Sequence, residues 1–270
     1  MAAPRIRVAV RVGIGGWVYE PWRDNFYPAG LPHARELEYA SRQLSAIEVN
    51  ATYYSTPTRA SVAKWRDSTP DDFVFSLKAS RFATNRRVLA DAGESVARFI
   101  ASGITELGPK LGPIVWQFAP TKRFDAQDFE AFLKLLPARA DGLALRHVMD
   151  VRHDSFKTPA YLKLARSHDV ATVLTESDEH PALFDPRSDL VYARIMRTES
   201  ALAEGCTPAT LDALAACAQR LQRGGLPDGM PLVEPAPSAD RRRREVFVYF
   251  IGGAKERAPA AAQALLRRLG

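Results

Sequence analysis

Short runs of β-branched and aromatic residues alternate along this chain with longer segments in which apolar residues recur every three or four positions. The first pattern is typical of buried strands and the second of amphipathic helices. Eight strands are predicted, at residues 8–15, 46–53, 73–80, 112–118, 143–152, 171–175, 189–196 and 245–251. Seven helices are predicted, at residues 32–44, 59–67, 92–107, 126–136, 159–168, 208–222 and 258–269. The connection 176–188 has no clear helical pattern, so we expect a loop alone to join its two strands.

This alternation predicts the architecture. Strands that alternate with helices are expected to pair in parallel through right-handed crossovers. Eight such strands favour a closed α/β barrel of the TIM type, which typically needs roughly 250 residues, and the chain has 270. We predict one TIM-like barrel domain over residues 1–270, with a proline- and arginine-rich loop inserted at 226–244. A doubly wound open sheet is the alternative.

The charge and the cysteine content indicate which binding partners and which cellular compartment to expect. Lys and Arg outnumber Asp and Glu by 37 to 31, and the resulting charge of +6 suits anionic partners. Cys206 and Cys217 match neither a zinc-binding nor a redox spacing, and unpaired thiols are typical of the reducing cytoplasm. The N-terminus does not resemble a signal peptide, and no apolar run is long enough to span a membrane. These features predict a cytoplasmic protein without a membrane partner, and they leave its oligomeric state open.

Polar side chains occupy alternate positions near the ends of several predicted strands. Alternation places Glu48 and Asn50 on one face of the second strand, and Asp150 and Arg152 on one face of the fifth. In a barrel these faces are expected to line the lumen, and functional residues gather where the strands end. The predicted catalytic residues are Glu48, Asp150 and Lys78. The predicted substrate-binding residues are Trp17, Asn50, Tyr54, Gln117, Arg152, His153 and Arg194.

These residue types favour an enzyme that acts on a phosphorylated or otherwise anionic small molecule. Lys78, Arg152 and Arg194 would hold the anion, because guanidinium forks match phosphate oxygens. Glu48 or Asp150 would transfer protons, and a desolvated Lys78 could instead form a Schiff base. No cofactor is predicted, and without a His or Cys cluster no metal site is predicted. Two alternatives are glycoside hydrolysis by the two carboxylates and a satisfied polar network with a structural role only.

Several short segments occur in an order that is specific as a set, although no single segment is. They are Gly15-Gly16-Trp17, Ile47-Glu48-Val49-Asn50, Phe75-Ser76-Leu77-Lys78, Leu111-Gly112-Pro113-Ile114 with Gln117, Asp150-Val151-Arg152-His153, Val191-Tyr192-Ala193-Arg194 and Val248-Tyr249-Phe250. The set resembles the domain-of-unknown-function-72 family, also called YecE-like, over nearly the whole chain. The resemblance implies a TIM-like barrel but no reaction, because the biochemical activity of that family is not established. Asp150 stands where the family usually has Glu, and the loops after Arg194 and Phe250 lack its usual polar residues.

A nucleic-acid-binding protein without small-molecule turnover is the alternative function. The positive charge, the arginine run at 241–244 and the aromatic residues Trp17, Tyr19 and Trp22 motivate it. Cationic grooves with aromatic platforms commonly hold single strands. The sequence does not place the arginine run relative to the barrel mouth.

Overall fold

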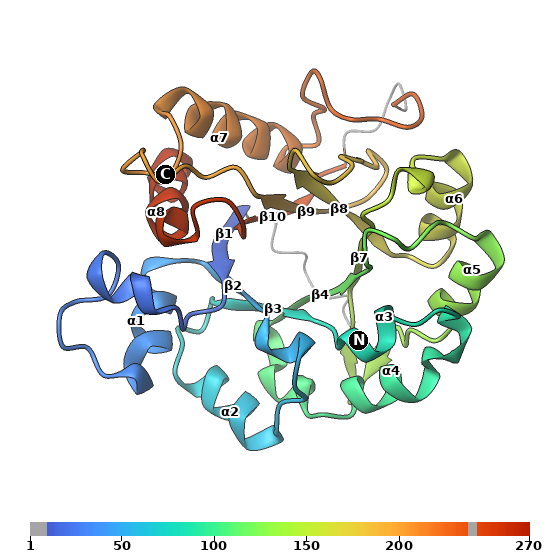
Figure 1. Cartoon of the computed structure of the whole chain (residues 1–270), viewed down its shortest axis with the longest axis horizontal. Helices are drawn as coiled ribbons and strands as arrows, with labels where there is room; N and C mark the ends of the chain where they lie inside the picture. Colours follow the sequence, from blue (N-terminus) through green and yellow to red (C-terminus); the bar gives the residue numbers. More distant parts are fainter. Residues whose placement is uncertain (1–9, 237–241) are drawn as a thin grey trace.

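Eight parallel strands close into a barrel at the centre of the molecule (Figure 1). The computed structural model describes residues 10–236 and 242–270, so the first two residues of the strand expected at 8–15 lie outside the described part. Neighbouring strands follow the order β1-β10-β9-β8-β7-β4-β3-β2, and each pair is parallel. The barrel strands are β1 (Val10–Gly15), β2 (Ala46–Val49), β3 (Val74–Lys78), β4 (Leu111–Gln117), β7 (His147–Asp150), β8 (Ala171–Glu176), β9 (Leu190–Ile195) and β10 (Glu245–Phe250). The closed barrel confirms the predicted TIM-like fold and excludes the open sheet.

A ring of helices surrounds the barrel (Figure 1). The helices are α1 (Glu36–Gln43), α2 (Arg59–Asp67), α3 (Arg81–Thr84), α4 (Gly93–Ile100), α5 (Ala126–Lys134), α6 (Pro159–Ser167), α7 (Pro208–Gln222) and α8 (Ala258–Leu269). Side-chain caps fix several of their starts: the hydroxyl of Thr158 accepts a hydrogen bond from the Tyr161 N–H at 3.2 Å, and that of Thr207 accepts one from the Thr210 N–H at 3.1 Å. In both places proline follows the cap, where its missing N–H costs nothing.

Two predicted elements are interrupted where glycine adopts a left-handed conformation. The helix expected at 92–107 ends with α4, and Gly103, with φ of 94°, separates it from a 3-10 segment at Ile104–Lys110. The strand expected at 143–152 begins only at β7. Its first residues pair instead in a small antiparallel hairpin of β5 (Arg139–Ala140) and β6 (Leu143–Ala144). Asp141 and Gly142 both have positive φ there, as two-residue hairpin turns require.

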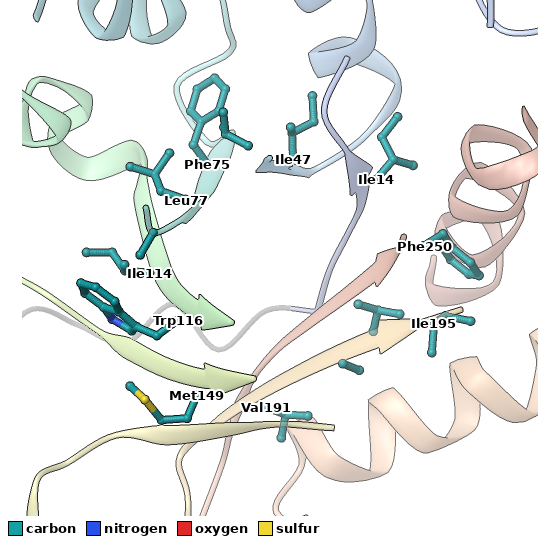
Figure 2. Close-up of a cluster of buried hydrophobic side chains, with 14 of the residues drawn as sticks. Ile14, Ile47, Phe75, Leu77, Ile114, Trp116, Met149, Val191, Ile195 and Phe250 are labelled. Atoms are coloured by element: carbon teal, nitrogen blue, oxygen red, sulfur yellow. The ribbon is translucent and has the colours of Figure 1, made fainter. Parts of the chain in front are cut away.

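The outer faces of the strands carry the main hydrophobic core. Figure 2 shows Ile14, Ile47, Leu77 and Trp116 pointing away from the lumen, and all four side chains are fully buried. Strand residues alternate between the two faces, so the intervening positions point into the barrel. The same apolar residues that attach the helices therefore fix which polar side chains face the lumen.

Aromatic rings fill the middle of the lumen. The ring centroids of Tyr192 and Tyr249 lie 5.0 Å apart, and Phe247 stacks on Tyr249 at 6.2 Å. Gly13 makes room for this column, because a Cβ there would lie 2.0 Å from the Ala46 carbonyl oxygen and 3.1 Å from the Tyr249 ring. The lumen below the mouth is thus packed with side chains, as in other barrels of this size.

The connection between β8 and β9 lacks a helix, as the sequence predicts. The described chain runs from Glu176 to Leu190 without one, and loops occupy this sector between α6 and α7 (Figure 1). Phe184 in this connection forms a β-bridge with Leu232 of the inserted loop. The inserted loop therefore covers part of the space that a helix would fill.

The described part of the arginine run, residues 242–244, lies at the end of the barrel opposite the mouth. Arg241 falls outside the described residues, whereas Arg244 immediately precedes β10 and is 2% exposed. Its guanidinium donates to the carbonyl oxygens of Pro186 at 2.6 Å and Ser188 at 3.1 Å. Arg244 thus anchors loops at the amino-terminal end of the barrel.

Candidate functional site

Five polar side chains meet inside the carboxyl end of the barrel. Glu48, Lys78, Gln117, Asp150 and Arg194 lie in the last two positions of β2, β3, β4, β7 and β9. The parallel barrel brings these strand ends to one level, although the residues are far apart in the sequence. The sequence predicts all five as site residues, and the structure brings them together.

Arg194 is the centre of this group. Its Nη2 lies 2.8 Å from Glu48 Oε1, and its Nη1 lies 2.6 Å from Asp150 Oδ2. The side chains of all three residues are at most 1% exposed. Tyr192 donates its hydroxyl to the other Glu48 oxygen, Oε2, at 2.7 Å. One guanidinium therefore holds two buried carboxylates, and both would lose their main partner if Arg194 were removed.

Arg152 extends the network toward solvent. Its Nη2 lies 3.0 Å from Asp150 Oδ2 and donates to Gln117 Oε1 at 2.9 Å. The same Gln117 oxygen accepts from Arg194 Nη1 at 3.0 Å. The Arg152 side chain is 12% exposed. Gln117 thus holds the two guanidinium groups in fixed positions, with Arg152 nearer the mouth.

The electrostatics of the network keep its charges in place. Burial opposes ionisation of Asp150, but Arg194 and then Arg152 outweigh it and lower the pKa of Asp150 below its usual value. Burial also disfavours the charged form of Arg194, yet Glu48 and Asp150 together raise its pKa. Burial and the nearby Glu48 charge raise the pKa of Tyr192, so this phenol remains a donor. Paired charges of this kind tolerate burial only while every partner is present.

Lys78 differs from the other charged residues of the site. It is 7% exposed, and its Nζ forms no hydrogen bond or ion pair with any residue in the described part of the chain. The Nζ lies 4.3 Å from the centroid of the Tyr53 ring, a cation–π distance. Burial, followed by repulsion from Arg194, lowers the pKa of Lys78 to about 8. Lys78 is therefore a largely buried lysine whose ammonium group has no hydrogen-bond acceptor among the described residues, and the charges of Glu48 and Asp150 compensate it only in part.

Four predicted binding residues, Trp17, Asn50, Tyr54 and His153, do not join the ion-pair network. Trp17 packs edge-on against Trp65 of α2, at 5.5 Å between ring centroids, on the outer side of the barrel wall. His153 caps a 3-10 turn, because its Nδ1 accepts the Ser155 N–H at 3.1 Å. Asn50 remains near the network through a long hydrogen bond of 3.4 Å to the Glu48 carbonyl. Tyr54, the fourth residue, is 63% exposed.

Tyr53, rather than Tyr54, reaches Lys78. The sequence pattern predicts a strand at residues 46–53, with Tyr54 directly after it as a substrate-binding residue. The strand β2 ends at Val49, and a 3-10 turn at Ala51–Tyr53 breaks the alternation. No signal in the sequence marks this early end, since β-branched and aromatic residues continue past it.

His180 also belongs to this region, although no pattern in the sequence marks it as a site residue. It lies in the loop after β8, where burial and then the positive charge of Arg152 lower its pKa. Its Nδ1 is buried and has no hydrogen-bond partner among the described residues. A histidine in a loop without regular pattern gives no periodic signal, but its place after a barrel strand is where functional loops occur.

The geometry of the site does not favour glycoside hydrolysis or nucleic-acid binding, the two alternative functions. Glycoside hydrolysis needs two carboxyl groups facing each other across a space for the sugar, whereas Arg194 lies between Glu48 and Asp150 and bonds to both. For nucleic acid, Trp22 is fully buried and donates its Nε1–H to the Lys255 carbonyl at 2.9 Å, so it offers no stacking surface. Trp17 and Arg244 lie at opposite ends of the barrel. Trp17, Trp22 and Arg244 therefore do not form one surface.

Within residues 10–236 and 242–270, no group of three or more His, Cys, Asp or Glu side chains is arranged to hold a metal ion. In the same ranges no helix combines the length and the hydropathy needed to cross a bilayer.

Comparisons with known proteins agree with the fold. The sequence profile of a family described as "Protein of unknown function DUF72" matches residues 11–270. UPF0759 protein YecE of Escherichia coli strain K12 is 26% identical over 150 residues, which are 54% of this chain and 50% of YecE. The match thus spans about half the length of this curated relative.

Two crystal structures of DUF72 family proteins are similar to the barrel. The protein from Enterococcus faecalis V583 has a TM-score of 0.70 at 18% identity, over 97% of this chain and 95% of that chain. The protein from Thermotoga maritima MSB8 has a TM-score of 0.68 at 22% identity, over 95% of this chain and 96% of that chain. At these identities the likeness shows the fold alone.

Proposed function

This chain belongs to the DUF72 family, whose description assigns no function, and we propose from its barrel mouth that it is an enzyme acting on a small anionic substrate. The observation that carries the proposal is Lys78. A largely buried ammonium without an internal acceptor is costly unless water or a ligand at the mouth supplies one. Perturbed lysines in such positions are common at functional sites.

The charge balance of the site supports an anionic ligand. Lys78, Arg152 and Arg194 carry three positive charges, whereas Glu48 and Asp150 carry two negative charges, which leaves a formal excess of one. Both Nη atoms of Arg194 bond to the two carboxylates, and its Nε is buried, so this guanidinium does not reach the mouth. Lys78 and the more exposed Arg152 are then the groups that would meet a phosphate or carboxylate entering from the mouth.

The roles of the predicted residues follow from their contacts. Glu48 and Asp150 are fully buried and bound to arginine, so in this proposal they position Arg194 and Arg152. Lys78 acts as the proton-transfer group, because a pKa of about 8 is close to the pH at which general acid–base catalysts work best. His180, whose lowered pKa favours the neutral imidazole at neutral pH, is a second candidate base.

Binding of simple anions at two pH values tests the proposal. Dimethyl phosphate and pyruvate remain singly charged, so isothermal titration at about pH 6.5 and about pH 9.5 brackets the Lys78 pKa of about 8 without changing the ligand. We expect at least one anion to bind at the lower pH and to weaken by about tenfold or more at the higher pH, because Lys78 loses its proton. Lys78→Met should abolish this pH dependence.

Lys255→Met is the matched control. Lys255 follows β10 at the same end of the barrel, and its Nζ lies over the Tyr19 ring at 4.2 Å. Removing this charge should leave anion affinity within about twofold, because a screened charge outside the site contributes little. An equal loss of anion affinity in both variants would show that the overall positive charge attracts the anion, with no specific site. If no anion binds to the unmodified protein, the proposal is refuted.

Turnover provides the second test. Candidate substrates of the chemical class that binds are incubated with the protein and followed by nuclear magnetic resonance. We expect Lys78→Met to lower the rate by roughly 10²–10⁴-fold, the usual contribution of a general acid or base. Conversion at an unchanged rate in this variant would assign the chemistry to another residue.

A further inference from the structure

A largely apolar pocket lies outside the barrel wall, in the sector where the helix between β8 and β9 is missing. Its volume is about 280 Å³, and it separates the outer faces of β8, β9 and β10 from α7. Ala193 and Ile195 of β9 and Ala218 of α7 are among its lining residues. Figure 2 shows Val191 and Ile195 on the outer side of β9, away from the lumen. The pocket is therefore separate from the polar network at the mouth.

The inserted loop closes part of this pocket. Met230 and Pro231 line it, and the Pro231 carbonyl accepts the Phe184 N–H at 3.0 Å. An apolar cavity of about 150 Å³ is sufficient to bind benzene. A pocket of about 280 Å³ therefore has room for a molecule with two fused rings or an aliphatic chain of similar size.

One end of the pocket carries an unused hydrogen-bond acceptor. Glu176, the last residue of β8, places Oε1 3.0 Å from Arg197 Nη1. Its other oxygen, Oε2, is buried and has no hydrogen-bond partner among the described residues. Burial raises the pKa of Glu176, against the opposing effect of Arg197. A carboxylate has about four acceptor positions, and Arg197 uses only part of them, so Glu176 can still accept a hydrogen bond from a donor in the pocket that it lines.

We propose that this pocket binds a small, mostly apolar molecule that donates one N–H or O–H group to Glu176. Apolar walls with a single oriented polar group are the usual composition of small-molecule sites. The missing helix provides the space, and Glu176 selects for a donor. The site lies on the face of β9 opposite Arg194, so it does not depend on the anion site at the mouth.

Indole and indene form a probe pair that isolates the donor. The two molecules have nearly the same shape, but only indole carries an N–H. We expect indole to bind by isothermal titration at least about tenfold more tightly than indene, since a hydrogen bond to a charged group contributes on that scale. Glu176→Leu should reduce the affinity ratio to about one. Glu179→Leu, which removes an exposed acid from the same loop, should leave the ratio unchanged.

The thiol of Cys217 provides an independent readout. Cys217 lines the pocket, and burial raises its pKa, so it should react slowly with a neutral maleimide. In a Cys206→Ser background, indole should lower the alkylation rate of Cys217 in proportion to the fraction of pockets that it occupies. Ala218→Leu, which fills the pocket, should abolish both indole binding and this protection.

Three outcomes would overturn the proposal. One is that neither probe binds or protects Cys217 in the unmodified protein, which decides the matter even if Ala218→Leu fails to fold. Another is that indole binding persists unchanged when Ala218→Leu fills the pocket. The last is that light scattering shows a dimer whose formation Ala218→Leu prevents, which would assign this apolar face to a second copy of the chain.

Discussion

Replacing Lys78 by methionine should stabilise the protein at neutral pH. Burial and the neighbouring arginines lower the Lys78 pKa from 10.5 to about 8. At about 1.4 kcal/mol for each pKa unit, the native state carries a cost of up to about 3 kcal/mol for keeping this ammonium charged. Methionine fills a similar volume without charge, so Lys78→Met should raise the free energy of unfolding by up to about 3 kcal/mol near pH 7.

The pH dependence of this gain has a definite sign. Below about pH 8 both the native and the unfolded chain carry a protonated Lys78, and the whole cost is present. Between about pH 8 and 10.5 the unfolded chain binds the proton more tightly, so the stability of the wild-type protein rises with pH. The advantage of Lys78→Met should therefore shrink across this window. Urea unfolding of both proteins at several pH values measures the difference between their free energies of unfolding. Groups that titrate in both proteins contribute equally and cancel from this difference.

Lys110 offers the matched control, because it is buried to the same extent but its ammonium group is hydrogen-bonded within the protein. It is 6% exposed, and its Nζ donates to the carbonyls of Arg66 at 2.6 Å and Thr69 at 2.7 Å. Lys110→Met leaves these acceptors unsatisfied and should destabilise the protein by about 1.5–3 kcal/mol. The reasoning about Lys78 fails if Lys78→Met destabilises as Lys110→Met does, or if its effect is constant with pH.

Three further substitutions test the packing of the barrel by urea unfolding. Arg194→Met leaves two buried carboxylates without their shared partner and should cost about 3–5 kcal/mol; a cost below about 1 kcal/mol would mean that the network is not buried as described. Gly13→Ala places a Cβ 2.0 Å from the Ala46 carbonyl oxygen and should cost about 1–3 kcal/mol or more, so a neutral result would contradict the close approach of β1 and β2. Tyr54→Ala changes a side chain that is 63% exposed and should remain within about 0.5 kcal/mol of wild type; a larger loss would give Tyr54 a structural role.

Local patterns in the sequence were sufficient for the elements and for much of the site. The start and end of α2, α7 and α8 agree with the predicted segments 59–67, 208–222 and 258–269. Alternation within strands is a property of neighbouring residues, and it correctly assigned Glu48 and Asp150 to the lumen. The missing helix after β8 was also readable, because an amphipathic pattern is either present or absent in the segment itself.

Only the tertiary structure decided how these side chains meet. Arg194 bonds to carboxylates 146 and 44 residues away in the sequence, and the separation between strand ends is set by barrel closure, which no local pattern encodes. The end of β2 at Val49 is likewise a tertiary result: Thr52 turns inward to donate to the Lys78 carbonyl at 2.7 Å, and Tyr53 then reaches the ammonium group. The sequence by itself determined which faces are polar. Packing between distant segments determined which charges are compensated there, and it left Lys78 with a cation–π contact but no hydrogen-bond or ion-pair partner in the described chain.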